Sequence, residues 1–350
     1  MRHRHPLHSF LLPLSTFLFP LSTFLLSPSA SAQNVKKARK GIIVLHTDSL
    51  MRAMEPYGGC SDDGAAYAGA VNEFKRRYSE ARVYCMIIPN AVAIYCPDSV
   101  ASWTANEQVY INRFYAKLDK DVTGIQLIDT LYNHRDEDIY LRTDHHWAPL
   151  GAFYAARTFA HIAEVPFLGL EHYTPQVVRH FVGTMLKFSG EKLLSNYPED
   201  FIYYVPNDVC YEATQVKYYN RTYRKRRRRY TVLTAKPKEN VSFFRSYDDG
   251  SAAAYSTFMG GDLNTTMVTT DTGNGRRLLI LKDSYGNALP PFLFASFEEI
   301  HVVDCRYFLG NIISYAKDHH ITDVLFANNL IHASTPAISQ NYNRYMTQSK

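Results

Sequence analysis

Short apolar blocks rich in β-branched residues recur along the N-terminal half of the chain. Residues 41–46, 82–89 and 125–128 each form such a block and are predicted to be strands. Between them, apolar residues recur at the three- and four-residue spacing of helices over 66–78 and 109–118. This β-α-β-α-β order predicts a parallel sheet covered by helices.

The C-terminal half continues the pattern. Residues 277–281, 299–303 and 323–326 are predicted strands, and helices are predicted over 152–162 and 289–297. The sheet-forming pieces therefore lie towards both ends of the chain.

Residues 165–240 lack a clear period and are rich in Tyr and Pro. They are predicted to be irregular, and the stretch at about 165–260 is interpreted as an insertion or lid rather than core. Residues 33–350 are expected to form a single domain of class α/β, with three α/β/α layers and a mainly parallel sheet.

The N-terminus has the three parts of a secretory signal peptide. Residues 1–9 are basic, 10–26 are almost wholly apolar or hydroxylic, and 27–32 end in Ala-Ser-Ala. Residues 1–32 are predicted to be removed before Gln33, which makes the protein secreted or places it in the cell envelope. An uncleaved membrane anchor is the alternative, but two prolines interrupt the short apolar run.

The formal net charge of +5 is unevenly distributed. Loss of Arg2 and Arg4 with the signal peptide leaves +3, and the run from Arg224 to Arg229 carries six positive charges, so the remainder is near −3. One basic cluster on a mildly acidic body is not the pattern of a nucleic-acid-binding protein. The run is interpreted as a solvated loop, with contact to an anionic polymer or lipid surface as the alternative.

Five cysteines, at positions 60, 85, 96, 210 and 305, leave at least one thiol unpaired. Their positions do not indicate a pairing, and no Cys/His spacing is typical of a zinc site. No metal or other cofactor is predicted.

Ser284 follows a predicted strand and precedes a predicted helix. A serine at such a turn projects from the carboxyl edge of a parallel sheet, where ligand sites of α/β proteins form. Its backbone N–H lies near a helix N-terminus and can stabilise an oxyanion, and Gly286 allows close backbone approach. Taken alone, Asp283-Ser284 also fits a helix N-cap.

The sequence Asp144-His145-His146-Trp147 changes this interpretation. A serine needs an imidazole base to attack an ester, and the base needs an acid that fixes its tautomer and stabilises the imidazolium. Asp144 and His146, on one loop, can supply both to a single site. Two alternatives remain: a metal site of Asp144, His145 and His146, with His134 as a further candidate, and a structural loop.

Three segments carry a family resemblance: TDHHW at 143–147, KDSYGNALPPFL at 282–293 and EIHVVDCRYF at 299–308. Together they resemble the bacterial DHHW-motif proteins, which are similar to the alginate O-acetyltransferase-like proteins of the SGNH hydrolase superfamily. The resemblance spans residues 41–331, is weakest near 205–240, and implies an SGNH-hydrolase-like domain.

In this superfamily the serine usually precedes the acid and base, whereas the alginate-type relatives have a permuted order with Asp-x-His first. Here His146 precedes Ser284 by 138 residues, as in the permuted order. The resemblance implies Ser284 as nucleophile, His146 as base and Asp144 as its orienting acid. His145 falls on the variable position.

The superfamily's oxyanion hole combines the nucleophile's N–H, a Gly N–H and an Asn side chain. The resemblance implies Asn328 as the side-chain donor, although Phe326 replaces the usual Gly before it; a turn asparagine is the alternative. Arg306 is a candidate substrate-binding residue, with a structural ion pair as the alternative. The Gly-Gly-Asp turn at 260–262 is given no role.

These predictions together indicate an exported serine esterase or O-acyltransferase that acts through an acyl-serine. The resemblance implies a polysaccharide carrying acetyl esters, or an acylated small molecule, as substrate, and no nucleic-acid partner is expected. The alternatives are a non-catalytic glycan-binding module on the same fold and a metal-dependent hydrolase that uses the histidine pair.

Overall fold

A computed structural model of the chain describes residues 34–225, 228–263 and 265–348. The predicted signal peptide and two arginines of the basic run lie outside the described residues. Within the described ranges, no helix combines the length and apolar character that a membrane span requires.

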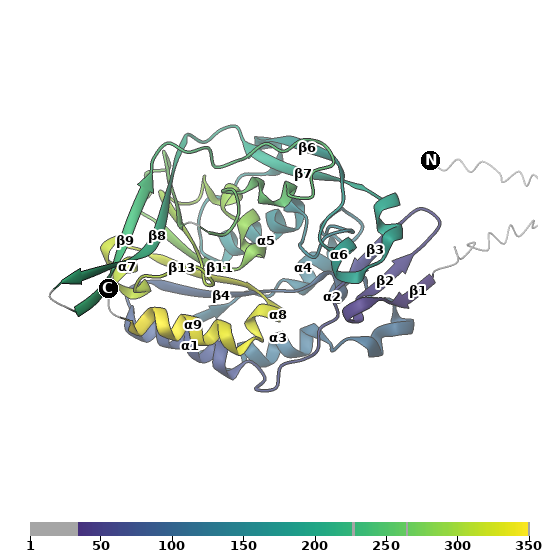
Figure 1. The fold of residues 1–350 in the computed structure, drawn as a ribbon, viewed down its shortest axis with the longest axis horizontal. Helices are drawn as coiled ribbons and strands as arrows, with labels where there is room; N and C mark the ends of the chain where they lie inside the picture. Colours follow the sequence, from purple (N-terminus) through teal and green to yellow (C-terminus); the bar gives the residue numbers. More distant parts are fainter. Residues whose placement is uncertain (1–33, 226–227, 264, 349–350) are drawn as a thin grey trace, which may run out of the picture.

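An eight-stranded sheet forms the middle layer of the molecule (Figure 1), in the order β5-β4-β13-β11-β12-β10-β8-β9. From β5 to β12 neighbouring strands are parallel, and β10, β8 and β9 continue the sheet in antiparallel pairing. The strands are β4 (Arg82–Ile88), β5 (Val122–Gly124), β8 (Tyr211–Lys225), β9 (Arg228–Lys238), β10 (Thr265–Thr270), β11 (Arg277–Lys282), β12 (Glu299–Asp304) and β13 (Asp323–Asn329).

Successive side chains of the parallel strands point to opposite faces of the sheet and pack into two separate cores. In β11, Leu279 and Leu281 belong to the core that contains α1, α3, α7 and α9, whereas Leu278 and Ile280 belong to the core that contains α5. Both faces of these strands are covered, which is why their side chains are almost all apolar. The predicted α/β class, with three layers and a mainly parallel sheet, is confirmed.

The helices have the following bounds: α1 (Ala65–Arg77), α2 (Ala91–Tyr95), α3 (Glu107–Tyr115), α4 (Ile128–Asn133), α5 (Pro149–Ile162), α6 (Met185–Ser189), α7 (Ile312–Asp318), α8 (Leu330–Ala333) and α9 (Pro336–Thr347). Short 3-10 helices are η1 (Arg39–Gly41), η2 (Asp98–Trp103), η3 (Leu170–His172), η4 (Lys192–Asn196), η5 (Ala254–Thr257), η6 (Ser284–Ala288) and η7 (Pro290–Leu293).

The prediction that residues 41–46 belong to the parallel sheet is wrong. β2 (Ile43–His46) pairs antiparallel with β1 (Asn34–Lys37) and β3 (Met51–Met54) in a separate three-stranded sheet. The connection from β2 to β3 is too short for the crossover that parallel pairing requires.

The predicted strand at 125–128 is also wrong. β5 ends at Gly124 and α4 begins at Ile128, so the apolar run is a buried connection between them. Apolar runs this short do not distinguish a strand from other buried backbone.

The predicted helix over 289–297 is replaced by the 3-10 helices η6 and η7. Pro290 and Pro291 begin η7, and two consecutive residues without an N–H cannot continue the hydrogen bonds of a helix that started at Ser284.

Residues 165–240 are ordered rather than irregular. β6 (Tyr173–Phe181) and β7 (Glu199–Pro206) form a two-stranded antiparallel sheet with α6 between them in sequence, and β8 and β9 join the main sheet. The Tyr and Thr residues that obscure helical periodicity here are strand formers. The division of residues 33–350 into one domain with an insertion stays a prediction. All of the cysteines are described, and each is a free thiol.

Candidate active site

Ser284 lies at the carboxyl edge of the main sheet, directly after β11 and Asp283. Asp283, and not Ser284, caps η6: its carboxylate accepts the Tyr285 N–H at 3.0 Å. Gly286 passes so close to Lys282 that a Cβ would collide with the lysine side chain. The serine therefore sits at the start of a tight turn whose cap is supplied by its neighbour, which leaves its hydroxyl for another partner.

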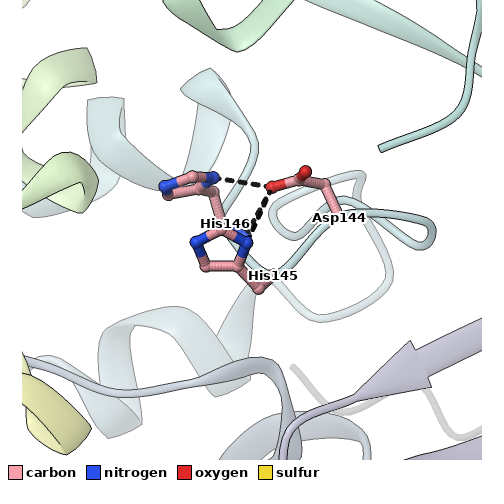
Figure 2. A group of neighbouring side chains, drawn as sticks. All are labelled: Asp144, His145 and His146. Atoms are coloured by element: carbon pink, nitrogen blue, oxygen red, sulfur yellow. Dashed lines mark hydrogen bonds and ion pairs between the residues drawn. The ribbon is translucent and has the colours of Figure 1, made fainter. Parts of the chain in front are cut away.

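That partner is His146. Its Nε2 lies 2.8 Å from Ser284 Oγ, and its Nδ1 lies 2.6 Å from Asp144 Oδ1. Figure 2 shows the carboxylate of Asp144 approached by the His146 ring. Both distances are those expected between a nucleophile, its base and the base's orienting acid. The structure thus brings together the three residues that the sequence selected from two distant parts of the chain.

The second oxygen of Asp144 is held by Thr184, just before α6. Asp144 Oδ2 accepts the Thr184 backbone N–H at 2.8 Å and its hydroxyl at 2.9 Å. At Gly183 a Cβ would collide with this carboxylate, so glycine is required there. Burial alone would raise the pKa of Asp144, but His146, His145 and the Thr184 N–H outweigh it and hold the pKa well below its ordinary value. Asp144 is therefore a carboxylate, ready to stabilise an imidazolium.

The loop that carries Asp144 is fixed by a second buried carboxylate. Glu199, the first residue of β7, accepts the backbone N–H groups of Arg142 and Thr143 at 2.8 Å and 2.6 Å. Burial raises the pKa of Glu199, against the opposing effect of these hydrogen bonds. The loop backbone before Asp144 thus depends on a residue far along the chain.

Aromatic side chains join the loop to the serine turn. Trp147 Nε1 donates to the Tyr285 carbonyl at 2.9 Å, and the Tyr285 hydroxyl donates to the His145 carbonyl. Tyr255, in η5, stacks on the His146 ring with centroids 3.8 Å apart and planes 8° apart. These contacts restrict the His146 ring to the orientation that faces Ser284.

His145 is held away from the serine. Its Nδ1 lies 2.6 Å from Thr184 Oγ1, and its ring is tilted against that of His146. Burial, together with the neighbouring His146, lowers the pKa of His145 to about 3, so it stays neutral. It therefore supports the Asp144–Thr184 contact and does not compete for the base role.

The metal alternative rests on donor atoms of Asp144, His145 and His146 that lie within 4.8 Å of one another. In this arrangement Asp144 Oδ1 and His146 Nδ1 are bound to each other, and His146 Nε2 faces Ser284. The donor set is thus already used within the protein. His134 lies apart from it, 2.6 Å from Glu137 Oε1.

Asn328 does not reach the serine turn. It is fully buried, and its Oδ1 accepts the hydroxyls of Tyr67 and Tyr342. Within the described part of the chain, its Nδ2 contacts the sulfur of Cys305 and no other partner. The prediction that its amide lines the oxyanion site finds no support in this geometry. The residue beside the turn is Asn329, whose N–H donates to Asp283 Oδ2 at 2.8 Å.

The backbone N–H of Ser284 lies at the same turn and is a candidate oxyanion donor. As the first residue of η6, Ser284 has an N–H without an intrahelical acceptor, and no other acceptor for it occurs among the described residues. This group can donate to a developing oxyanion.

Arg306 is an ion-pair residue. Its Nη2 lies 2.7 Å from Asp304 and 2.8 Å from Asp262, while Lys282 Nζ contacts the same two carboxylates at 2.8 Å and 3.1 Å. The structural alternative for Arg306 is thus the one that its contacts show, although its side chain keeps 26% exposure. Asp262 also accepts Asn287 Nδ2 at 2.7 Å, so the Gly-Gly-Asp turn braces η6.

A second imidazole lies on the other side of the serine turn. His332, in α8, places Nδ1 2.7 Å from Asp283 Oδ2. Burial would lower its pKa, but Asp283 outweighs this and raises it. Four residues around the site carry no signal in the sequence, because none belongs to a motif and three lie in the segment interpreted as an insertion: His332, Thr184, Glu199 and Tyr255.

A hollow of about 600 Å³ lies beside the loop that carries Asp144. It is lined by Glu137, Tyr140, Arg142, Glu199 and Tyr204, among others, and not by Ser284. We assign it no chemistry, because its buried carboxylate, Glu199, is already committed to the loop backbone.

A family profile described as DHHW protein matches residues 30–303. The crystal structure of a DHHW family protein from Eubacterium siraeum is 36% identical with a TM-score of 0.77, covering 91% of this chain and 99% of that chain. No sequence among curated proteins matches.

Two further solved structures are more distant. PatB1 of Bacillus cereus, solved with a sulfonyl adduct, is 21% identical with a TM-score of 0.64, covering 84% of this chain and 96% of that chain. The O-acetyltransferase domain of Pseudomonas putida AlgJ is 13% identical with a TM-score of 0.46, covering 89% of this chain and 99% of that chain. The likeness to PatB1 covers most of both chains and shows a shared fold.

Proposed function

The chain belongs to the DHHW protein family, and from this premise we propose that it is an exported serine esterase or O-acyltransferase of the SGNH type. The observation that carries the proposal is the line of contacts from Ser284 Oγ through His146 to Asp144, at 2.8 Å and 2.6 Å. Ser284 is the proposed nucleophile, His146 the base and Asp144 the orienting acid.

In the first half-reaction, His146 Nε2 takes the Ser284 proton as Oγ attacks the acyl carbonyl. The His146 Nδ1–H donates to Asp144, which fixes the tautomer and stabilises the imidazolium. The Ser284 N–H stabilises the oxyanion. Collapse of the intermediate releases the alcohol, which takes the proton from His146, and leaves an acyl-serine.

In the second half-reaction, His146 accepts a proton from water or a sugar hydroxyl as that oxygen attacks the acyl-serine. Collapse returns the proton to Ser284 and releases either the free acid or a new ester. The same three residues thus serve hydrolysis and transfer.

The substrates that we propose are acetyl esters of a cell-surface or extracellular polysaccharide. Two considerations support this class: the signal peptide predicted from the sequence, and the resemblance to alginate-type acetyltransferases on which the triad order was assigned. Only the second is an analogy with the family, and a small acetyl ester tests the chemistry independently of it.

The proposal is tested with a fluorophosphonate probe and a small chromogenic acetyl ester. We expect the wild type to be labelled at Ser284 and to hydrolyse the ester, and Ser284→Ala to do neither while melting at the same temperature. Phenylmethylsulfonyl fluoride is a second probe, chosen because PatB1 has been solved with a sulfonyl adduct.

Ser314→Ala is the matched control, because Ser314 is a partly exposed serine in α7. This variant should retain labelling and hydrolysis. A wild-type protein that is folded and takes up neither probe would instead support the non-catalytic glycan-binding alternative, and chelator-sensitive hydrolysis by Ser284→Ala would support the metal-dependent one.

A further inference from the structure

The β8–β9 hairpin extends beyond the body of the molecule (Figure 1). β8 is 15 residues long, but only residues 211–216 pair with β10. From Lys217 onward β8 pairs with β9 alone, and its other edge has no partner strand among the described residues. About half of the hairpin is therefore a two-stranded ribbon outside the main sheet.

The ribbon leaves the sheet at the edge where Ser284 lies. Val216 pairs with Thr265, and the adjacent Thr266 pairs with Val302 near the carboxyl end of β12. Because β12 runs parallel to β11, residues after Val216 continue past the carboxyl edge of the sheet. Tyr218 lines a shallow hollow with Asp262 and Asp304, the carboxylates that bind Arg306.

The ribbon has an inner and an outer face. On the inner face, Tyr218 packs edge-on against Phe308, with ring centroids 5.6 Å apart, and Leu233 lines a hollow with Arg344. Directly opposed residues share a face and alternate along a strand. The outer face is therefore formed by Lys217, Tyr219, Arg221, Tyr223, Val232 and Lys236. Tyr219, Tyr223 and Val232 are 36%, 37% and 44% exposed.

The charge of the ribbon is one-sided. Residues 213–238 include ten Lys or Arg and no Asp or Glu. Lys217 lies directly opposite Lys236, and Arg224 opposite Arg229, and like charges so placed destabilise a hairpin. Among the described residues, no ion pair involves a lysine or arginine of β8 or β9. Arg221 lies over the Tyr223 ring, with its Cζ 5.4 Å from the ring centroid, but this contact leaves its positive charge uncompensated. A row of cations without carboxylate partners among the described residues fits an anionic partner from outside the chain.

We propose that the outer face of the β8–β9 ribbon binds an anionic polysaccharide and holds it beside the edge of the sheet that carries Ser284. The ribbon is two strands wide, which suits a linear polymer, and its cations alternate with exposed tyrosines, whose rings offer flat apolar surfaces to sugars. Only the choice of a polysaccharide as the polymer rests on the proposed function.

The test measures binding of the full chain carrying Ser284→Ala to polygalacturonate, with neutral dextran and phosphatidylglycerol vesicles as comparison probes, at low salt. The hairpin variant is Lys217→Gln, Arg221→Gln and Lys236→Gln combined. The matched control removes three exposed lysines elsewhere, Lys120→Gln, Lys192→Gln and Lys317→Gln, and thus has the same net charge.

We expect binding to polygalacturonate but not to dextran, about tenfold weaker in the hairpin variant and unchanged in the control. Tyr219→Ser should also weaken polygalacturonate binding. When the hairpin and Tyr219→Ser substitutions are made in the chain that keeps Ser284, both proteins should hydrolyse a small acetyl ester normally. Equal losses in hairpin and control variants would overturn the proposal, as would tighter binding to the vesicles than to the polymer.

The two proposals fail separately. Polymer binding is measured in a protein without the nucleophile, so a failure of esterase activity leaves its result unaffected. Loss of polymer binding with intact labelling of Ser284 in the wild type would remove the ribbon's role and leave the proposed chemistry standing.

Discussion

Two aspartate–histidine pairs flank Ser284, and they are nearly identical as pairs. Asp144 and His146 approach to 2.6 Å on the loop before α5, and Asp283 and His332 approach to 2.7 Å between the serine turn and α8. Both carboxylates are buried, and the pKa of each is lowered by its histidine against the effect of burial. Chemistry inside the pair therefore does not distinguish them.

The two pairs differ in what the second ring nitrogen of each histidine faces. His146 Nε2 faces Ser284 Oγ, and its ring is buried under Tyr255. His332 Nε2 contacts no described hydrogen-bond partner, and its side chain is 35% exposed. The Asp283 carboxylate, in turn, receives the backbone N–H groups of Tyr285 and Asn329. One pair is placed to move a proton at the serine, and the other to hold the serine turn in shape.

The largest expected difference is in catalysis. We expect His146→Gln to lower kcat/KM for an acetyl ester about 10⁴-fold, because Ser284 loses its base. His332→Gln should lower it less than tenfold, because no atom of His332 contacts the serine hydroxyl. Steady-state kinetics on both variants checks this, and comparable losses would show that the second pair takes part in proton transfer.

The next largest effect is on stability. Asp283→Asn should reduce the free energy of unfolding by about 2 kcal/mol, because a fully buried carboxylate loses its charge-assisted hydrogen bonds. An amide at this position would direct an N–H group at the backbone donors of Tyr285 or Asn329. Urea unfolding measures the change, with the exposed Asp121→Asn as the control. A stability loss no larger than in the control would contradict the holding role.

Thr184 tests the proposed catalytic pair, Asp144 and His146, because it contacts the Asp144 carboxylate. Thr184→Val keeps the shape of the side chain and removes the hydroxyl that donates to Asp144 Oδ2. We expect kcat to fall about 10-fold, the effect of one hydrogen bond to a charged group, with KM unchanged. Thr158→Val, which removes a hydroxyl bonded within α5, should leave kcat as it is.

The smallest expected effect is a pH dependence confined to the holding pair. The pKa of His332 is raised above its ordinary value of 6.5 by Asp283, so protonated His332 stabilises the fold. This contribution is fully present below about pH 6.5 and is lost as the pH rises through the higher folded pKa. Unfolding of wild type and His332→Gln across this range should converge as pH increases. A constant difference between them would contradict the assignment.

Local sequence patterns predicted much of the fold. Strand β4 and strands β11 to β13 were recoverable as short apolar blocks, because both of their faces are buried. Helices α1, α3 and α5 were recoverable because each buries one face, which leaves a period of about 3.6 residues. The errors have a common cause. Neighbouring strands decide whether residues 43–46 pair in the main sheet or in a hairpin. They also decide whether Ile125 lies in a strand or in a connection, and no local period records them.

The site divides in the same way. Motif residues were enough to select Ser284, His146 and Asp144, whereas the asparagine was misplaced. Asn328 and Asn329 are adjacent in β13, so their side chains alternate between the two faces of the sheet, and only Asn329 lies on the side of Asp283. Nothing in the local sequence marks Thr184 or Glu199 as a partner of the loop. Any polar side chain of similar length could have supplied the same hydrogen bonds if the fold had placed it there.

What the sequence alone determined is therefore a set of chemical groups and the order of the elements that carry them. Which groups meet was decided by the tertiary structure. A hydrogen bond between side chains 138 residues apart depends on how β11, the 140–147 loop and the segment around Thr184 pack together, and that packing is a property of both cores at once. The two aspartate–histidine pairs differ in role for this reason: short contacts between similar groups are common, and only the surrounding fold determines what the remaining nitrogen faces.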